Sequence, residues 1–341
     1  MFIINNNNNK KEITMNNLKK VGLSALAASL VSLSAQAGEL TVSGAASMTY
    51  ENYTVAATED QHNNKTFTQA NNIYFTGGGE LDNGLSVSVS FELDEGSRSS
   101  TAQTSVWDNH SVTVSSDSLG SLTLAGHGGS SAQSAIDTTA AGDIFDNFDA
   151  TAGIAATEVF NSSKAGNNIM LYTLPSMVDG LSASVSYQAG GNADAGGKSS
   201  TAYAATYTGF EGLTLSYGKG EDNSTPSNQR DVTTIAASYS YGPVTVAYTT
   251  SENDATTANT DQELDSYAIT YSITENMSVK YGNETFKNDA DAVDPEYTSI
   301  SASYTSGGMT VSVGQQTAEN ADGTATDKDV DYTYLGLSFA F

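Results

Sequence analysis

Apolar residues alternate with small or polar residues along short segments that recur from Leu40 to the last residue. The segment 85–93 reads LSVSVSFEL, and the final segment 332–341 reads YTYLGLSFAF. A period of two places the apolar side chains together on one face of a β-strand. The chain is therefore predicted to be all-β, with strands that each carry one apolar face.

Polar connections separate these segments, and tight turns alternate with longer loops along the chain. Asn83-Gly84 is typical of a tight hairpin turn, because both residues tolerate positive φ. The pattern predicts sixteen strands, with seven tight turns on one side and eight longer loops on the other. Expected strands include 39–53, 66–80, 85–93, 121–127 and 167–174.

The apolar faces are expected to point outward, into lipid. Several of them end in Tyr or Phe, as the aromatic belts of membrane barrels do. The opposite faces hold mostly Ser, Thr, Ala, Gly and Asn, and sixteen strands enclose a channel that must contain water. The sequence thus predicts a sixteen-stranded antiparallel transmembrane β-barrel, closed so that no strand edge meets lipid.

The first 37 residues have the pattern of a cleaved export signal. Lys19 and Lys20 precede the short apolar run 21–33, and Ala35-Gln36-Ala37 is a small-residue cleavage site. Met15 is an alternative start, since low-complexity asparagines precede it. The predicted domains are a signal peptide over 1–37 and a barrel over 38–341, located in the outer membrane after export through the periplasm.

The charge balance is strongly acidic. The whole chain has a formal net charge of −26, and removal of residues 1–37 takes away four lysines and one glutamate, which leaves −29. Such a surface repels nucleic acid and favours cations. With no cysteine, the exported chain has no disulfide framework, so strand pairing must hold the fold.

Three hairpins resemble those of a known family. Residues 71–93 (NNIYFTGGGELDNGLSVSVSFEL), 111–127 (SVTVSSDSLGSLTLAGH) and 172–187, together with the terminal Phe341, are similar to segments of the general porins of Gram-negative outer membranes. The resemblance implies a homotrimer embedded in outer-membrane lipid and lipopolysaccharide. It also implies a water-filled channel for passive diffusion of small hydrophilic solutes, and no enzymatic activity.

One departure from that family bears on selectivity. Its members usually carry Arg or Lys at the positions of Asn72, Thr76 and Leu171, which form a basic wall facing an acidic loop. Those cations are missing here. Together with the net charge, their absence predicts a preference for cations.

The long connection 128–166 shows no sustained period of two and is, in the family, the loop that narrows the lumen. Its length without regular structure favours a functional role. Phe145, Phe148 and Phe160 are expected to pin it to the wall. A ring of carboxylates in a narrow passage selects cations, so the predicted constriction residues are Asp137, Asp143, Asp146, Asp149 and Glu158. Lys280, on an inward strand position, is a candidate wall cation that pairs with a loop carboxylate; a lumenal lysine away from the constriction is the alternative.

Asp327, Asp329 and Asp331 share one face of the last strand and are weak candidates for a Ca²⁺ or Mg²⁺ site bridging to lipopolysaccharide. A charged rim above the membrane is the simpler interpretation. The chain contains no Cys, no His pair at ligand spacing and no nucleophile motif, so no cofactor and no catalytic site are predicted. A secreted β-rich coat protein or adhesin without channel activity remains the alternative.

Overall fold

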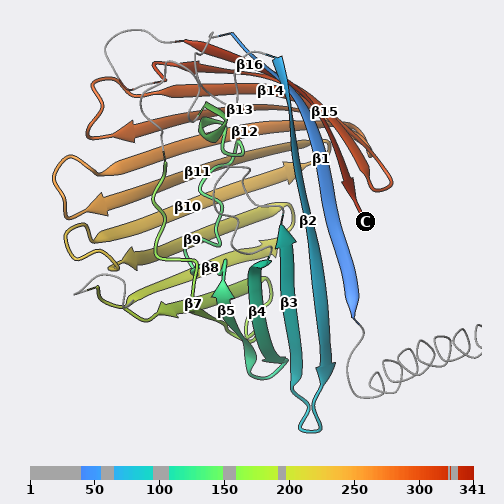
Figure 1. Ribbon diagram of the computed structural model, residues 1–341, viewed down its shortest axis with the longest axis vertical. Coiled ribbons are helices and arrows are strands. Elements are labelled where there is room, and N and C mark those ends of the chain that lie inside the picture. The colour runs from blue at the N-terminus through green and yellow to red at the C-terminus, as the bar shows by residue number, and fades with distance from the viewer. Residues whose placement is uncertain are drawn as a thin grey trace, which may run out of the picture.

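Sixteen antiparallel strands form one closed barrel within residues 40–54, 65–94, 107–148, 159–190, 197–321, 323 and 329–341, the parts of the chain that the computed structural model describes. Each strand pairs with its neighbours in sequence, and β1 pairs with β16 to close the ring (Figure 1). The strands are β1 (Thr41–Tyr53), β2 (Lys65–Glu80), β3 (Ser86–Asp94), β4 (Trp107–Ser116), β5 (Gly120–His127), β6 (Ile169–Thr173), β7 (Leu181–Gln188), β8 (Ser200–Phe210), β9 (Leu213–Asp222), β10 (Arg230–Tyr241), β11 (Val244–Ala255), β12 (Gln262–Thr274), β13 (Met277–Asn288), β14 (Glu296–Ser306), β15 (Met309–Glu319) and β16 (Val330–Ala340), and a 3-10 turn, η1 (Phe145–Phe148), lies between β5 and β6.

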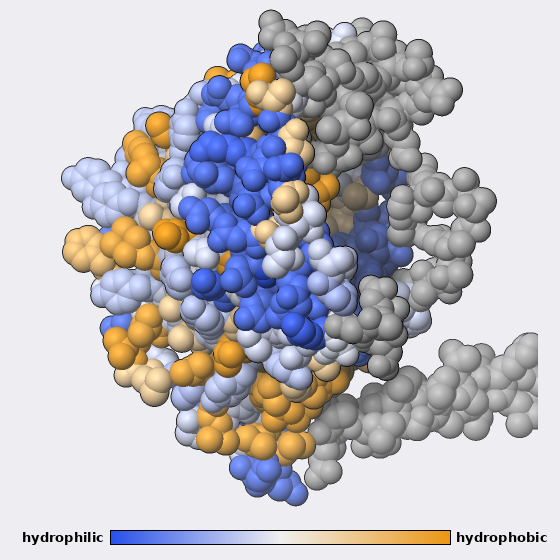
Figure 2. All heavy atoms as spheres, turned by 90° about the vertical axis from the view of Figure 1, so that its left-hand side faces the viewer, coloured by the Kyte–Doolittle hydropathy of each residue, from blue (hydrophilic) through white to orange (hydrophobic). Residues whose placement is uncertain are grey.

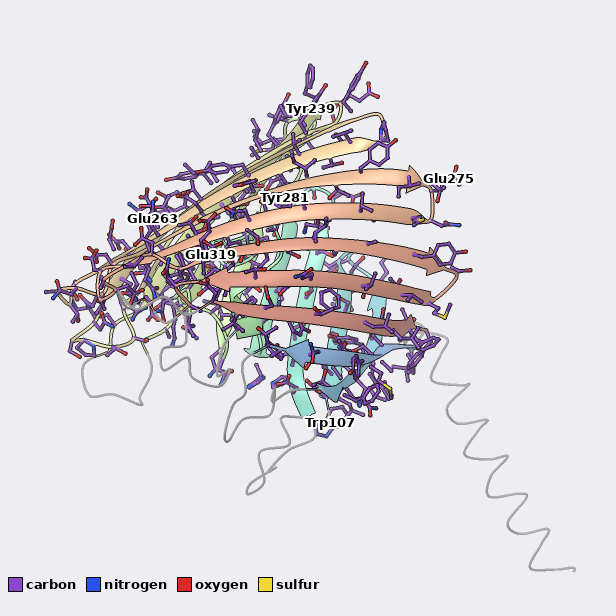
Figure 3. All side chains as sticks on the ribbon, turned by 90° about the horizontal axis from the view of Figure 1, so that it is seen from above. Trp107, Tyr239, Glu263, Glu275, Tyr281 and Glu319 are labelled. Carbon is purple, nitrogen blue, oxygen red and sulfur yellow. The ribbon has the colours of Figure 1, made fainter. Side chains whose placement is uncertain are left out.

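The predicted fold class, strand number and alternation of short and long connections are confirmed. Glu263 and Glu319 lie at the end of the barrel with the longer connections, and Glu275 lies in a tight turn at the other end (Figure 3). β6 begins at Ile169, two residues later than expected, because Asn168 has a left-handed backbone with φ of 57° that interrupts the strand. In the predicted Asn-Gly turn, Gly84 has φ of 79°, as that turn chemistry requires.

The seam of the barrel is closed by the last residue of the chain. Phe341 lies just beyond β16, its amide N–H donates to the carbonyl of Gly44, and its own carbonyl accepts from the amide of Gly44, each over 3.0 Å. The paired register then continues along β1 and β16 from Ala45 opposite Ala340 to Tyr53 opposite Tyr332. The outer edges of the first and last strands are thereby paired with each other, and no strand edge stays open.

The outer face is apolar, as predicted. Exposed large side chains follow one parity of the strands, for example Tyr267, Ile269, Tyr271 and Ile273 on β12. Seen from the end with the longer connections, hydrophilic residues fill the middle of the molecule while hydrophobic residues project at the left edge (Figure 2). Among the described residues, no helix has the length and apolar character needed to cross a bilayer.

The apolar core lies on the other parity, between the connection that follows β5 and the strands β12–β16 and β1. It contains aromatic residues of that connection and of the strands, and its members are fully or almost fully buried: Tyr53, Ala141, Ile144, Phe145, Phe148, Leu264, Phe286, Tyr297, Ala318, Ala321, Val330 and Tyr332. The barrel therefore has its packed interior where the long connection meets the wall. The predicted signal peptide, 1–37, lies outside the described residues.

Candidate functional site

The long connection between β5 and β6, here called the β5–β6 loop (128–168), is described over 128–148 and 159–168. Its base is closed by an isolated bridge in which Gly129 and Gly166 exchange two backbone hydrogen bonds, of 2.9 and 2.6 Å. Gly128 and Gly166 both have positive φ, 67° and 99°, so the chain turns sharply out of β5 and back into β6. The loop thus leaves the sheet and returns through a narrow neck.

Inward-facing side chains of β10 and β12 hold the first limb of the loop. Gln133 donates from Nε2 to Oγ1 of Thr234 over 2.9 Å, and its Oε1 accepts the amide of Ser163 in the returning limb over 2.8 Å. Farther along, Oγ of Ser266 accepts the amides of Ala140 and Ala141, each over 2.9 Å. These buried bonds satisfy backbone groups that would otherwise lack partners.

Two glycines on the strands leave room for this close packing. A Cβ atom on Gly282 of β13 would lie 2.7 Å from the Cβ of Ala141, and one on Gly218 of β9 would lie 2.9 Å from Cδ1 of Ile136. Both distances are too short for carbon atoms in contact. At these two positions the wall residue is glycine because the loop backbone or side chain lies directly on it.

Aromatic rings pin the tip region of the loop. Phe145 packs against Phe286 with ring centroids 5.4 Å apart, and Phe148 lies 5.7 Å from the ring of Tyr297. Phe160 of the returning limb also reaches Phe286, at 6.5 Å. The prediction that Phe145, Phe148 and Phe160 attach the loop to the wall is confirmed.

The loop carboxylates lie on its opposite side. Asp137, Asp143 and Asp146 are exposed, whereas Ile144 and Phe145 between them are buried. The Asp143 amide donates to Oγ1 of Thr139 over 2.9 Å, and that hydroxyl donates back to the Asp143 carboxylate over 3.0 Å. The loop thus presents an apolar face to the wall and an acidic face to the open space of the barrel.

Desolvation by the surrounding loop and wall raises the pKa of Asp143 above its ordinary value, and the charge of Asp137 adds to that effect. The pKa of Asp146 is also raised, first by desolvation and then by the charge of Asp143. The charge of Asp137 therefore makes Asp143 harder to ionise, and the charge of Asp143 does the same to Asp146. A cation near the group would relieve both repulsions.

Two inward side chains of β13 hold the loop backbone between these carboxylates. Lys280 donates from Nζ to the carbonyl oxygen of Ala141 over 2.6 Å. Glu284, fully buried, accepts the amide of Phe145 on Oε2 over 3.1 Å, while its Oε1 has no hydrogen-bond partner among the described residues. Lys280 lies on the inner wall, as expected. Its ammonium group donates to a backbone carbonyl of the loop.

The wall facing the loop also carries carboxylates. In a closed ring of sixteen strands, β3 lies eight strands from β11 and so stands opposite the strands that hold the loop. On β3, buried Glu92 accepts the amide of Asn72 over 3.1 Å and the amide of Asn109 over 2.5 Å. On the loop side of the barrel, buried Glu51 of β1 accepts the hydroxyl of Thr68 over 3.0 Å and lies two residues before Tyr53, whose hydroxyl donates to the carbonyl of Asn147 in the loop over 2.8 Å. Asn72 therefore orients an acid where the family resemblance places a base.

The structure brings Asp137, Asp143, Asp146 and Lys280 together on and under the β5–β6 loop. Asp149 and Glu158 lie outside the described residues. Sequence reasoning missed Glu92, Glu51 and Glu284, because each is a single acid on an inward strand position. The only feature of the sequence that could have identified these three acids was their position on the inward face of a strand.

The metal hypothesis for the last strand is not advanced by the structure. Asp327 lies outside the described residues, and Asp329 is exposed just before β16. Asp331 accepts the hydroxyl of Thr317 over 2.9 Å. No group of three His, Asp or Glu side chains suited to a metal ion occurs among the residues that the structure describes.

A closed sixteen-stranded barrel with an apolar outer face, and with a carboxylate-bearing loop packed on its inner face, defines the class of outer-membrane β-barrel channels. Residues 22–274 match the family model described as Gram-negative porin. The chain belongs to this family and is an outer-membrane porin channel. The family is one of non-enzymatic channels, in agreement with the absence of a predicted catalytic site.

Solved structures agree on the fold. An anion-selective porin from Comamonas acidovorans superposes with a TM-score of 0.63 at 15% identity, covering 89% of this chain and all of that one. A triple mutant of the Rhodopseudomonas blastica porin gives 0.63 at 14% identity, with coverage of 89% and 100%. Salmonella typhi OmpF, in a complex with daunomycin, gives 0.62 at 13% identity, with coverage of 89% and 98%. No curated protein matches the sequence.

Proposed function

We propose that this porin conducts small hydrophilic solutes by passive diffusion and prefers cations. The observation that supports the preference most directly is the exposed acidic face of the β5–β6 loop, formed by Asp137, Asp143 and Asp146. Carboxylates in a confined aqueous passage attract cations and repel anions. Asp149 and Glu158, the other predicted constriction residues, belong to the same proposal.

The inner wall supports the same conclusion. Among strand residues with described side chains, the basic residues on inward positions are Lys280 and Arg230, and Lys280 is engaged with the carbonyl of Ala141. Inward acids outnumber them: Glu51, Glu80, Glu92, Asp94, Asp222 and Glu284. The Comamonas porin is anion-selective on a similar fold, so the selectivity must be decided by such side chains and not by the barrel.

Reversal potentials of the purified channel in a KCl gradient test the preference. The wild-type protein is expected to give a potential on the cation side, and replacement of Asp137, Asp143 and Asp146 together by Asn should move it toward zero. A matched triple replacement of Asp231, Asp254 and Asp265, which lie on outward strand positions, should leave it unchanged. An anion-sided wild-type potential would overturn the proposal.

We also propose that three copies associate through the face formed by β15, β16 and β1–β6. All the exposed tyrosines of the described strands lie on β7–β14. Tyrosine concentrates where protein meets the lipid–water interface. The opposite face exposes no tyrosine among its described strand residues; its exposed large side chains are aliphatic, such as Met48, Leu335 and Leu337, or are Phe and Trp. The lack of tyrosine fits a surface covered by neighbouring copies in a closed ring.

The trimer face is tested with a matched pair of alanines. Ala46 on β1 and Ala237 on β10 both lie on outward positions that are half-buried. Ala46→Trp should lower the temperature at which the oligomer dissociates in detergent, because the added ring has no room between copies. Ala237→Trp, facing lipid, should not. Equal behaviour of the two variants would refute the assignment of this face.

Export of the chain rests on the predicted signal peptide, and we propose that cleavage follows Ala37. Mass spectrometry of the N-terminus of the protein from outer membranes tests it: a first residue of Gly38 is expected. The alternative of a secreted coat or adhesin would require no conductance from the folded barrel. Stepwise conductance in a planar bilayer would exclude it.

A further inference from the structure

The inner wall next to the β5–β6 loop carries an aromatic ring that lies flat on a glycine. Tyr334 of β16 stands opposite Gly314 of β15 in the register. A Cβ atom on Gly314 would lie 2.6 Å from Cε1 of Tyr334 and 2.7 Å from both its Cζ and its hydroxyl oxygen. Nearly equal distances to these three atoms place that point over the face of the ring and not at its edge. One face of Tyr334 therefore rests on the wall, because Gly314 has no side chain there.

Neighbouring rings hold Tyr334 in this position. Its ring is stacked on that of Tyr332 with centroids 5.5 Å apart and an angle of 24° between the planes, and Tyr332 is stacked in turn on Tyr53 at 4.4 Å. Tyr53 and Tyr332 are almost fully buried, and Phe148 of the loop packs against both, at 6.5 and 6.4 Å. Tyr334 is the partly exposed end of this stack, on an inward strand position. It therefore offers a fixed aromatic surface to the passage.

Toward the tight-turn end of the barrel, the wall beside this ring is lined with hydroxyl groups. The next inward row of the register, on five adjacent strands, consists of Ser278, Ser303, Ser312, Gly336 and Thr49. The inward row after it contains Thr305, Thr310, Ser338 and Ser47. The hydroxyls of Ser278 and Ser303 share a hydrogen bond of 3.0 Å, as do those of Thr305 and Thr310. Each hydroxyl has one donor and two acceptor positions, so these bonds leave further positions open to a solute.

These two hydroxyl rows contain no charged side chain. The charged residues in the row of Tyr334 itself are Lys280 on β13 and Glu51 on β1. The ammonium group of Lys280 donates to the carbonyl of Ala141 over 2.6 Å, and buried Glu51 accepts the hydroxyl of Thr68 over 3.0 Å. Because both charges are engaged with the protein, the surface beside Tyr334 favours an uncharged solute.

An aromatic face beside rows of hydroxyls is complementary to a pyranose sugar. The ring of such a sugar has a face of C–H groups, which packs on the negative face of an aromatic side chain. Its rim carries hydroxyls, which exchange hydrogen bonds with Ser and Thr. Sites for small solutes combine an apolar surface with a few placed polar groups in this way. An open-chain polyol has the hydroxyls without the flat C–H face.

We propose that Tyr334 and the adjacent hydroxyl rows form a binding site for neutral sugars in the pyranose form. The C–H face of the sugar lies on the exposed face of Tyr334, and its hydroxyls point toward Ser303 and Ser312. The inference goes beyond the proposed cation preference and does not depend on it, because the ligand is uncharged. Sugars of this class should remain in the passage longer than open-chain polyols of the same size.

The test measures K⁺ current through wild-type channels in planar bilayers, with methyl β-D-glucopyranoside added on both sides. The expected result is a saturable fall in conductance beyond the fall in bulk conductivity of the same solution, whereas sorbitol should give only the bulk effect. Tyr334→Leu should raise the half-saturating concentration by about two- to tenfold, the range that one aromatic contact supplies. Tyr334→Phe keeps the ring and should bind as wild type does. Tyr304→Leu, the same change on an exposed outward position of β14, is the matched control and should not alter binding.

A second variant moves the ring without changing it. Gly314→Ala places a methyl group where the face of Tyr334 now rests, so the ring must tilt away from the wall, and the half-saturating concentration should rise as it does in Tyr334→Leu. Because these substitutions change no charge, the reversal potential in a KCl gradient should stay as in wild type. A saturable effect that survives unchanged in both Tyr334→Leu and Gly314→Ala would overturn the proposed site. So would weaker binding accompanied by an altered reversal potential, since the ring would then act through the loop.

The outcomes also separate this inference from the general cation preference. A cation-sided potential in KCl without any saturable effect of the glucoside would refute the site alone. A glucoside effect sensitive to both variants, in a channel with no preference in KCl, would support the site and refute the general selectivity. Heat-modifiable migration on gels checks that each variant is assembled.

Discussion

The ammonium group of Lys280 donates a 2.6 Å hydrogen bond to the carbonyl oxygen of Ala141, in a loop 139 residues away in sequence. This bond joins the first part of β13 to the segment of the β5–β6 loop that bears Asp143 and Asp146. Lys280 therefore acts in two ways. It adds a positive charge beside an acidic passage, and it fixes the height of the loop above the wall.

Replacement of Lys280 by Met keeps the length of the side chain but removes both the charge and the donor. The cation-sided reversal potential should increase, because the loop carboxylates lose a neighbouring positive charge. Current noise in the open channel should also rise as the loop loosens. Lys287→Met is the control, since Lys287 lies on the outward parity of the same strand, bonded to Glu263. A smaller cation preference in Lys280→Met would contradict the expectation.

Glu284 lies four residues after Lys280 on β13 and holds the loop by accepting the amide of Phe145. Replacement by Gln preserves an acceptor oxygen of the same reach, whereas Ala leaves that buried amide without a partner, at a cost of about 1–3 kcal/mol. Glu284→Ala should therefore raise the conductance and its fluctuations, while Glu284→Gln should resemble wild type. Single-channel recording distinguishes them. Identical traces from all three proteins would show that the bond does not hold the loop.

Much of the barrel could be predicted from local pattern. The alternation of apolar and polar residues in a strand such as β3 can be read from neighbouring residues alone. The aromatic residues Phe145, Phe148 and Phe160 are likewise conspicuous within a mostly polar loop. The partners of Glu284 and Glu92 could not be predicted in the same way. Phe145 lies 139 residues from Glu284, and its meeting with that acid depends on the register of the whole barrel and on the path of the loop.

The faces of the strands illustrate the same limit. Inward parity was predictable for Asn72 and Glu92, but parity alone does not tell which inward residues touch. Their contact follows from the register in which Asn72 stands opposite Asp94 and Tyr74 opposite Glu92. The sequence showed that Asn72 stands where the family usually has a basic residue. That Asn72 donates a hydrogen bond to Glu92 could be seen only in the structure.

The raised pKa values of Asp143 and Asp146 predict how selectivity depends on pH. As the pH falls, both carboxylates should become neutral at a higher pH than the ordinary 3.8 of an aspartate, so the cation preference should begin to weaken above that value. Because the charge of Asp143 contributes to the shift of Asp146, Asp143→Asn should move the remaining titration toward lower pH. Reversal potentials measured as a function of pH in one salt gradient give both midpoints.

The same shifts have a definite sign for stability. Carboxyl groups whose pKa is raised on folding bind protons more tightly in the folded state, so their contribution to the free energy of unfolding is most favourable below the ordinary pKa and is lost as pH rises through the raised one. Asp143→Asn should remove part of this dependence. A titration of selectivity and of melting temperature centred at or below 3.8 would contradict the desolvation described for these two groups.

The terminal Phe341 provides the last test, because it helps to join the first strand of the barrel to the last. Its backbone exchanges two hydrogen bonds with Gly44, each of 3.0 Å, and its ring covers the space where Gly44 has no side chain, since a Cβ there would lie 2.8 Å from Cζ of Phe341. Deletion of Phe341 removes both bonds, worth about 1 kcal/mol each, and uncovers the edge of β1 at the seam. The yield of assembled, heat-modifiable protein should fall and its melting temperature should drop. Phe341→Leu keeps the backbone pairing and shortens only the ring, so its melting temperature should lie between those of the deletion and wild type. If the deletion assembles and melts as wild type does, the seam does not depend on its last residue.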